Sequence, residues 1–419
     1  MKPLIKENLR EKLYFYCLLY LALSLPFQFI WFPPTLGIIF LMLTWIFSFD
    51  FRQKGKYLSK NLLFKIVFGL FLMSLVGMIY TPSPEEGWKD VTVKISLFFF
   101  PIALGSYPPI RKEKLNLLLK TFAFAMGLAV LYLILKAGSK FLDDGDLNHF
   151  FYGNFGSLKR VPIHYFALYC NFALFISLDF LFNKTKGSPF AIKLLFGALS
   201  LLLISALYLC SIRIQFIAFI LVLVLFFIRQ FRGKMPNYKI ALSLFGSILL
   251  ISLIAFLIPE SKRRITETLD EYSAFRGREE LKQMNHRVFL WKYGSQVISE
   301  NFWLGTGTGE ANNALYEYLK NEKAKFWDGT GVYTLSKKKY NYHNAFLQHF
   351  ASNGILAFLF LVALLLIPLF SKSHEFSMVQ SVFLVLVAIS FMTESMLERQ
   401  AGTLFFGLFY SLIVINQRK

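Results

Sequence analysis

Long blocks of apolar residues constrain this sequence more than any other feature. Of its 419 residues, 56% are hydrophobic and only 17% are charged, whereas soluble domains average about 25% charged residues. The blocks lack the period-two alternation of barrel strands, and helices satisfy their own backbone hydrogen bonds in lipid. This pattern excludes a soluble globular enzyme, a disordered chain and a fibrous repeat. It predicts an all-α, polytopic integral membrane protein.

About twelve transmembrane helices are predicted, because a bilayer needs roughly 20 apolar residues per helix. The expected spans are 13–32, 35–51, 62–80, 91–107, 117–139, 166–182, 194–210, 214–228, 240–258, 344–370, 378–395 and 403–416. The predicted organisation is therefore transmembrane helices 1–9 over residues 1–258, a loop domain over 259–343, and transmembrane helices 10–12 over 344–419. Together the spans form one membrane domain.

The positive charges predict the orientation of the chain. The net charge is +20, and the two termini with every second loop carry about 21 Lys and Arg residues, against about 6 in the short loops of the other set. Because retained loops collect Lys and Arg, both termini are predicted to be cytoplasmic and the loop 259–343 to lie outside. The basic start precedes an apolar run with no small-residue cleavage site, which predicts an uncleaved first span.

The outer loop is predicted to form a small helical cap. Apolar spacing predicts helices over 285–300, with Trp291 and Ile298 on the apolar face, and over 311–323. Residues 305–309 (GTGTG) lie between them. Since no strand precedes this segment, it predicts a turn rather than a nucleotide site.

No metal site and no disulfide is predicted. His343 and His349 are six residues apart, so they point to different helix faces. The three cysteines all fall inside apolar blocks, where a buried small hydrophobe is the expected role. They are Cys17, Cys170 and Cys210.

Two arginines are candidate anion ligands, because ionisable residues at a membrane edge are costly unless they bind or pair. Arg213 lies in a tight turn between two spans at the outer edge. It either meets lipid headgroups by snorkelling or faces an anionic headgroup from within the bundle, where the guanidinium fork suits phosphate oxygens. Arg287 lies in the first turn of the loop helix, where a cation opposes the helix dipole. The alternative for Arg287 is a solvated surface arginine.

His343 and Glu394 are candidates for proton chemistry at the same edge. A histidine at the water–lipid boundary can be neutral and accept a proton from a hydroxyl, although it can equally be a capping or interfacial residue. Glu394 and Glu398, beside Arg399, form a polar cluster at the end of span 11. Either these groups pair structurally, or Glu394 orients a catalytic group.

Four segments of the chain, in order, resemble the motifs of the O-antigen ligase/polymerase superfamily. They are residues 211–213 (SIR), 287–291 (RVFLW) followed by 301–307 (NFWLGTG), 343–348 (HNAFLQ) followed by 353–355 (NGI), and 393–398 (TESMLE). They are similar to the family's S-R turn between two spans, R…W…(P/F)-x-x-G-x-G, H-N-x-x-L…G-I and E-S-x-L-E. The resemblance covers about residues 200–400, together with the span layout and the large outer loop. Ile214 departs from it, since a small residue is commoner after the arginine.

The resemblance implies transfer of an undecaprenyl-pyrophosphate-linked glycan on the periplasmic face of the bacterial inner membrane. A ligase attaches this glycan, the O-antigen, to a hydroxyl of the lipid A–core oligosaccharide. The reaction implied is inverting and independent of metal and cofactor, and no nucleic acid takes part.

The resemblance also implies roles for individual residues. Arg213 and Arg287 would bind the pyrophosphate, and His343 would be the general base that deprotonates the acceptor hydroxyl. Three further candidates for substrate binding are Arg160, His164 and Glu394.

Two alternatives remain beside the ligase. A polymerase, which joins lipid-linked repeat units, shares the same motifs. A transporter or flippase of lipid-linked sugars is the alternative from another class. Its charges would lie near the midplane between repeated halves, whereas here the candidates gather at the outer edge and no repeat is evident.

Overall fold

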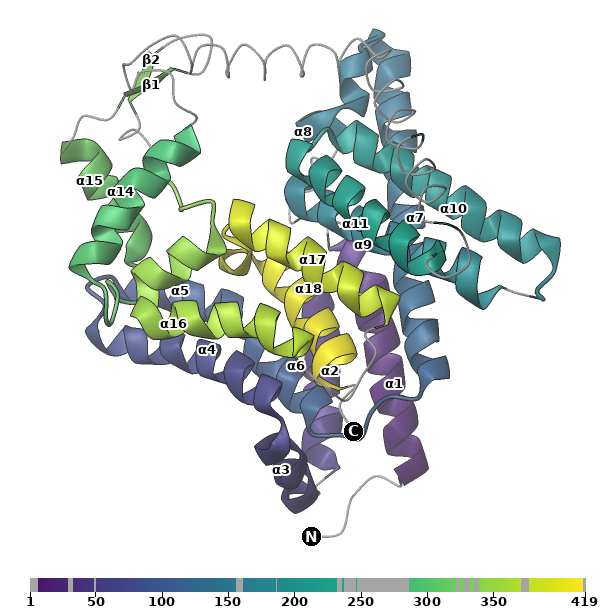
Figure 1. Cartoon of the computed structure of the whole chain (residues 1–419), viewed down its shortest axis with the longest axis horizontal. Coiled ribbons are helices and arrows are strands. Elements are labelled where there is room, and N and C mark those ends of the chain that lie inside the picture. Colours follow the sequence, from purple (N-terminus) through teal and green to yellow (C-terminus); the bar gives the residue numbers. More distant parts are fainter. Residues whose placement is uncertain are drawn as a thin grey trace.

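The computed structural model is a bundle of helices with a smaller helical unit at one end (Figure 1). It describes residues 7–28, 33–48, 50–155, 161–185, 187–231, 236, 246, 286–321, 325–327, 332–334, 339–370 and 377–416. The predicted ninth span, 240–258, lies outside these residues apart from Gly246, and so does Arg160.

The first part of the chain, up to residue 155, folds into helices of very different length. They are α1 (Glu7–Ser24), η1 (Leu25–Phe27), α2 (Pro34–Phe47), α3 (Phe51–Lys60), α4 (Leu62–Tyr80), α5 (Pro84–Lys94), α6 (Ser96–Gly105), α7 (Lys112–Asp144), η2 (Leu147–Phe150) and α8 (Tyr152–Phe155). The rest of the chain adds a second set of helices and one hairpin. Its elements are α9 (Ile163–Asp179), η3 (Phe180–Lys184), α10 (Phe190–Cys210), α11 (Arg213–Phe231), α14 (His286–Glu300), α15 (Ala311–Asn321), β1 (Lys325–Trp327), β2 (Val332–Thr334), α16 (Ala345–Leu369), α17 (Met378–Thr393), η6 (Met396–Glu398), α18 (Gln400–Tyr410) and η7 (Ser411–Ile415).

Six helices in the described part of the chain are long and apolar enough to cross a membrane. They are α4, α7, α9 with η3, α10, α11 and α16. A seventh results if the bent pair α2 and α3 is one span, and α17 and α18 with η7 are apolar but shorter. The all-helical, polytopic class is confirmed, and the count of twelve spans is not confirmed within these residues.

The single span predicted over 91–107 is wrong, because two short helices meet there. The amide of Ile95 still bonds to the Thr92 carbonyl, but α5 ends at Lys94 and α6 begins at Ser96. The first of them carries acidic and basic residues, so its apolar side is too narrow for a span. The two loop helices expected over 285–300 and 311–323 are confirmed as α14 and α15, and an antiparallel hairpin of β1 and β2 follows them.

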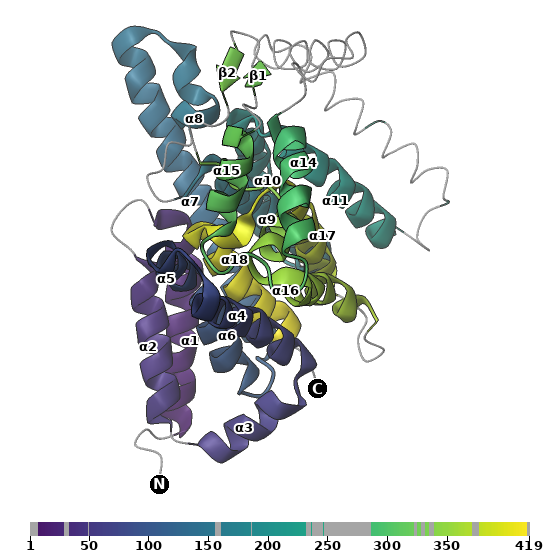
Figure 2. The same cartoon turned by 90° about the vertical axis from the view of Figure 1, so that its left-hand side faces the viewer.

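Helix α9 forms the centre of the bundle, where it contacts α7, α10, α11 and α17 (Figures 1 and 2). Aromatic rings fill the space around it. The ring of Tyr169 stacks on Phe405 with centroids 4.7 Å apart, and Phe122 meets Phe409 edge-on at 4.7 Å. Such pairs add to the burial of apolar area, so this layer holds α7, α9 and α18 together.

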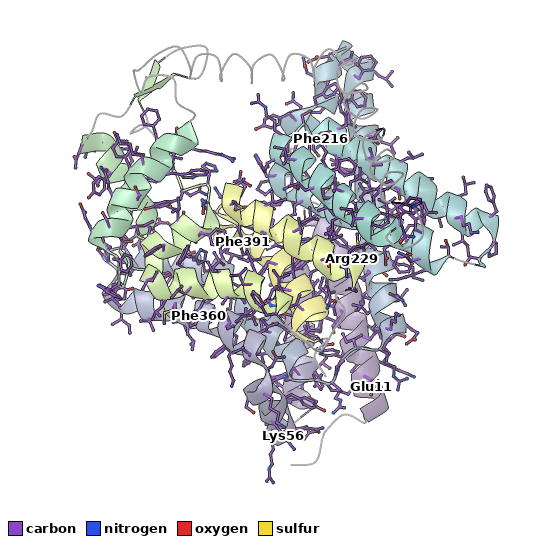
Figure 3. All side chains as sticks on the ribbon, in the orientation of Figure 1. Glu11, Lys56, Phe216, Arg229, Phe360 and Phe391 are labelled. Atoms are coloured by element: carbon purple, nitrogen blue, oxygen red, sulfur yellow. The ribbon has the colours of Figure 1, made fainter. Side chains whose placement is uncertain are left out.

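Phe391 extends this packing toward the outer end of α17 (Figure 3). Its fully buried ring lies 6.0 Å from Phe346 on α16 and 5.4 Å from Phe406 on α18. This contact brings the last turn of α17 against the first turn of α16. The start of α1 and helix α3 lie at the end of the molecule opposite α14, α15 and the hairpin (Figures 1 and 2).

Residues 305–309 (GTGTG), called the glycine clamp below, join α14 and α15 to α16. Helix α16 is interrupted at Asn353 and Gly354, and Gly354 has a φ of 74°. The free backbone groups around this break pair with the clamp: the amide of Thr306 donates to the Ala351 carbonyl at 2.8 Å, and the amide of Gly307 to that of Ser352 at 3.0 Å. The turn that the sequence predicted here is therefore a docking element.

The clamp also contacts the outer end of α4. The hydroxyl of Thr308 donates to the Ser74 carbonyl at 2.7 Å, and the side-chain Nδ2 of Asn353 donates to the Thr308 hydroxyl at 2.9 Å. A Cβ built on Gly307 would lie 2.7 Å from the Thr81 Cα. Only glycine permits so close an approach. The spacing of the glycines therefore follows from the close meeting of three backbone segments: the clamp, the end of α4 and the break in α16.

Replacing Gly354 with alanine is expected to lower the free energy of unfolding by roughly 2–5 kcal/mol, because the backbone is strained and the site has no space. The new Cβ would lie 2.1 Å from the Trp303 carbonyl oxygen. The measurement is the melting temperature of the purified protein in detergent. Gly197→Ala in α10 is the control, since nothing lies within 4 Å of its Cβ position. Equal melting temperatures for the two variants would contradict the clamp.

Candidate active site

Glu394 is the centre of the candidate site. It caps the C-terminus of α17, where its amide donates to the Ser390 carbonyl at 2.8 Å. The backbone then turns sharply, since the amide of Met396 donates to the Glu394 carbonyl, also at 2.8 Å. Only 14% of the Glu394 side chain is exposed. A carboxylate so enclosed requires partners.

Arg287 is the first partner of Glu394. Its Nη2 lies 2.7 Å from Glu394 Oε1, across 107 positions of sequence. Arg287 is the second residue of α14, where a cation opposes the helix dipole, and the ion pair offsets this cost. About a quarter of its side chain, 26%, is exposed. The contact joins the outer helical unit to the end of α17.

His343 is the second partner, and its backbone is held in a rare conformation. Its φ of 44° lies in the left-handed region, and its amide donates to the Asn341 Oδ1 at 3.1 Å. Asn344 follows: its side chain caps α16 and also donates to the Met392 carbonyl at 3.2 Å. These bonds direct the imidazole toward α17, where Nδ1 lies 3.2 Å from Glu394 Oε2.

His164 is the third basic side chain on this carboxylate. It lies in the first turn of α9, with Nε2 3.9 Å from Glu394 Oε1. This separation is within ion-pair range but too long for a hydrogen bond. α9, α14, α17 and the segment before α16 thus each contribute one side chain to the cluster.

Three basic neighbours keep Glu394 ionised. Burial acts to raise the pKa of Glu394, but the hydrogen bond from His343 and the charges of His164, His343 and Arg287 outweigh it, so its pKa lies below the ordinary value. The ionised carboxylate therefore accepts a hydrogen bond from His343 Nδ1–H, so the neutral imidazole carries its proton on Nδ1. The Nε2 atom is left with a lone pair that can accept a proton from a substrate hydroxyl.

A layer of bonds behind His343 fixes the segment that carries it. Trp291 Nε1 donates to the Tyr342 carbonyl at 2.9 Å, and the amide of Tyr342 donates to Gln348 Oε1 at 3.1 Å. A Cβ built on Gly294 would lie 2.6 Å from the Tyr342 ring. Sequence reasoning did not single out Tyr342 or Gln348. The signal that could have found them is the polar run NYHN at the mouth of a span.

Arg213 lies at the same end of the bundle as this cluster. It is exposed and opens α11, directly after a turn in which Ser211 has a φ of 53°. Two residues after Arg213, the Gln215 carbonyl accepts from Asn171 of α9 at 2.8 Å, and the Gln215 side chain donates to the Ser390 hydroxyl of α17 at 3.5 Å. These contacts pack the start of α11 against the middle of α9, about two turns from His164, and against the last turn of α17, which ends at Glu394.

Six site residues were selected from the sequence, and the structure brings four of them together: Arg287, His343 and His164 surround Glu394. Arg213 occupies the neighbouring helix end, and Arg160 lies outside the described residues. Within the ranges described above, no group of three or more His, Cys, Asp and Glu side chains is arranged to hold a metal ion.

Part of this chain is similar to a known protein family. Residues 198–362 match the model of a protein family described as O-Antigen ligase. The matched segment runs from α10 to α16 and includes Arg213, Arg287 and His343. No curated protein matches the chain. The family match supports the resemblance of the segments 211–213, 287–307 and 343–355, whereas 393–398 lies beyond the matched residues.

Proposed function

We propose that this chain belongs to the O-antigen ligase superfamily and is an inverting glycosyltransferase that moves a glycan from undecaprenyl pyrophosphate to a hydroxyl of the lipid A–core oligosaccharide. The observation that carries the proposal is the convergence of Arg287, His343 and His164 on the buried carboxylate of Glu394. The apolar helices and the family are those of a bacterial membrane protein.

The proposed reaction is a direct displacement at the anomeric carbon of the donor sugar. The acceptor oxygen forms a bond to that carbon while the bond to the pyrophosphate oxygen breaks, and the electron pair leaves with the pyrophosphate. The hydroxyl proton passes to His343 Nε2. Because attack is opposite to the leaving group, the configuration inverts.

The residues divide these tasks between them. His343 is the general base, and Glu394 is a positioning residue that holds the imidazole and stabilises the imidazolium that forms. Arg287 and Arg213 neutralise the charge developing on the pyrophosphate. His164 faces the same carboxylate and is assigned to substrate binding, and Arg160 remains a candidate for it.

We further place the site on the periplasmic face of the inner membrane, with both termini cytoplasmic, because the Lys and Arg residues gather in the loops of the opposite side. The acceptor is then a lipid of the outer leaflet. The start of α1 and the outer helices lie at opposite ends of the molecule, in agreement with this placement (Figure 1).

A chromosomal deletion tests the proposal. A ligase deletion accumulates long lipid-linked polymer that is never transferred to the core, and the intact gene restores transfer. Core capped with single repeat units would instead identify a polymerase, and lipid-linked units trapped on the cytoplasmic leaflet would identify a flippase. Either outcome would overturn the ligase assignment.

Replacing Arg213 with lysine is expected to lower the transfer rate about 10- to 100-fold, because an ammonium cannot replace the two-pronged hydrogen bonds of a guanidinium. The measurement is transfer to lipid A–core in membranes with equal protein content. Arg229→Lys, at the other end of the same helix (Figure 3), is the matched control and should retain its rate. If Arg213→Lys has the same transfer rate as the control, Arg213 only contacts lipid headgroups.

A further inference from the structure

A second buried ionic cluster lies on the far side of the turn that carries Glu394. Lys94 Nζ lies 2.7 Å from Asp90 Oδ2 and 2.8 Å from Glu398 Oε1. The exposed fractions of these side chains are 1% for Lys94, 7% for Asp90 and 14% for Glu398. Lys94 thus joins α5 to η6. Neither the motifs nor the proposed reaction uses this cluster.

Burying one ammonium between two carboxylates is costly unless each charge has a partner. Burial and the neighbouring Glu398 raise the pKa of Asp90 to about 7. Burial acts in the same direction on Glu398, but Lys94 outweighs it and holds the pKa of Glu398 below its ordinary value. Glu398 is therefore the ionised partner of Lys94, and His349 on α16 faces the same charges.

The cluster acts on the site through a very short piece of backbone. Glu398 and Glu394 are the two ends of one turn, in which the amide of Glu398 donates to the Ser395 carbonyl at 3.0 Å. The hydroxyl of Ser395 contacts Gln348 Oε1 at 3.3 Å, the same atom that accepts from Tyr342. A shift at Glu398 therefore displaces both Glu394 and the support of His343.

The turn has little freedom on its other side. Met396 and Leu397 are fully buried, and a Cβ built on Gly402 would lie 2.0 Å from the Met396 carbonyl oxygen. The hydroxyl of Thr403 donates to the Val93 carbonyl, next to Lys94, at 2.9 Å. α5 and the start of α18 thus enclose the turn, and Lys94 supplies the charge that draws it inward.

We propose that Lys94 is a positioning residue: by holding Glu398 it fixes the turn from Glu394 to Glu398 and keeps the Glu394 carboxylate opposite His343 Nδ1. The consequence for glycan transfer rests on the proposed function, whereas the consequence for the His343 imidazole does not. The two can therefore be tested separately.

The test reads the tautomer of His343 by 15N NMR of histidine-labelled full-length protein in lipid nanodiscs at alkaline pH. The chain has six histidines, and the signal of His343 is identified by its loss in His343→Asn. In the wild type, the contact with Glu394 keeps the proton on Nδ1. In Lys94→Met, the turn loses its anchor, and most of the His343 signal is expected to move to the Nε2-protonated form.

Lys89→Met is the matched control, because Lys89 lies on the same helix but is exposed, with Glu86 as its partner. It should leave the tautomer unchanged. Lys94→Met/Asp90→Asn/Glu398→Gln is the second variant, since it removes all three buried charges of the cluster and so favours folding. It is expected to elute as a single species and still lose the Nδ1-protonated signal.

Several results would overturn the inference. An unchanged tautomer in either folded Lys94 variant would show that Lys94 does not position Glu394. If both Lys94 variants aggregate while Lys89→Met remains soluble, Lys94 stabilises the helix bundle in general and does not specifically position Glu394. If the tautomer changes as expected but the wild type shows no transfer to lipid A–core, the positioning role stands and the proposed function fails.

Discussion

Replacing His343 with asparagine is expected to slow glycan transfer by roughly 10²- to 10⁴-fold, which is the usual contribution of a general base. Asparagine tolerates the left-handed region better than most residues, and His343 has a φ of 44°. The variant therefore keeps the backbone and removes the imidazole. The measurement is the initial rate of transfer with saturating donor and acceptor.

His149→Asn is the control for this experiment. His149 lies in η2, beyond the end of α7, and pairs with Asp144, the last residue of α7, at 2.6 Å. Its rate should equal that of the wild type. A His343→Asn rate within a few fold of the control would remove His343 from the mechanism and leave the Glu394 cluster as a structural ion pair.

Replacing Glu394 with glutamine is the second large effect, with an expected loss of roughly 100-fold or more, because two hydrogen bonds to a charged group are lost. The side-chain amide of the new glutamine can also donate to His343 Nδ1. The imidazole proton then lies on Nε2, the atom that has to accept the proton of the acceptor hydroxyl. Transfer rates at neutral pH measure the effect. Glu300→Gln is the control, since Glu300 is exposed at the end of α14, and a Glu394→Gln rate equal to it would contradict the assignment.

The pH dependence of stability tests the same carboxylate without substrate. The pKa of Glu394 lies below its ordinary value in the folded protein, so its ionised form stabilises the fold. That contribution is present above the ordinary range of glutamate and is lost as the pH falls through the lowered pKa. The difference in melting temperature between the wild type and Glu394→Gln should therefore shrink as the pH falls below the ordinary range of glutamate.

Much of the fold followed from hydropathy alone. The span predicted over 62–80 coincides with α4, because Asn61 caps its start and Pro82 follows its end. The span predicted over 117–139 is shorter than α7, which continues to Asp144. Hydropathy reports the apolar part of a helix, whereas capping decides where it ends, so helices that leave the bilayer are underestimated.

The loop helix α14 shows a second limit of sequence reasoning. Its apolar face was predicted from Trp291 and Ile298, and Ile298 is indeed buried. Trp291 is only half-buried, while Leu290 and Val297 are fully buried against α15 and α16. On a short helix, several faces fit the same spacing, and only the position of the neighbouring helices selects one.

The candidate site was predicted as single residues but not as an assembly. Arg287, His343 and Glu394 each carried a chemical signal, yet their contacts span 107 and 51 positions, which depend on how helices pack. Lys94 was missed because it fell inside an expected span. The sequence did contain a signal, because Asp90 lies four positions before Lys94 and both residues adjoin an apolar block.

The glycine clamp has a consequence for how relatives of this chain can diverge. The clamp binds α4 and α16 directly, and Tyr342 is held separately by Trp291. The chain is therefore anchored independently before Asn321 and after Tyr340. Insertions or deletions between these two residues should be tolerated without moving the imidazole. That stretch is thus a suitable place to insert a tag.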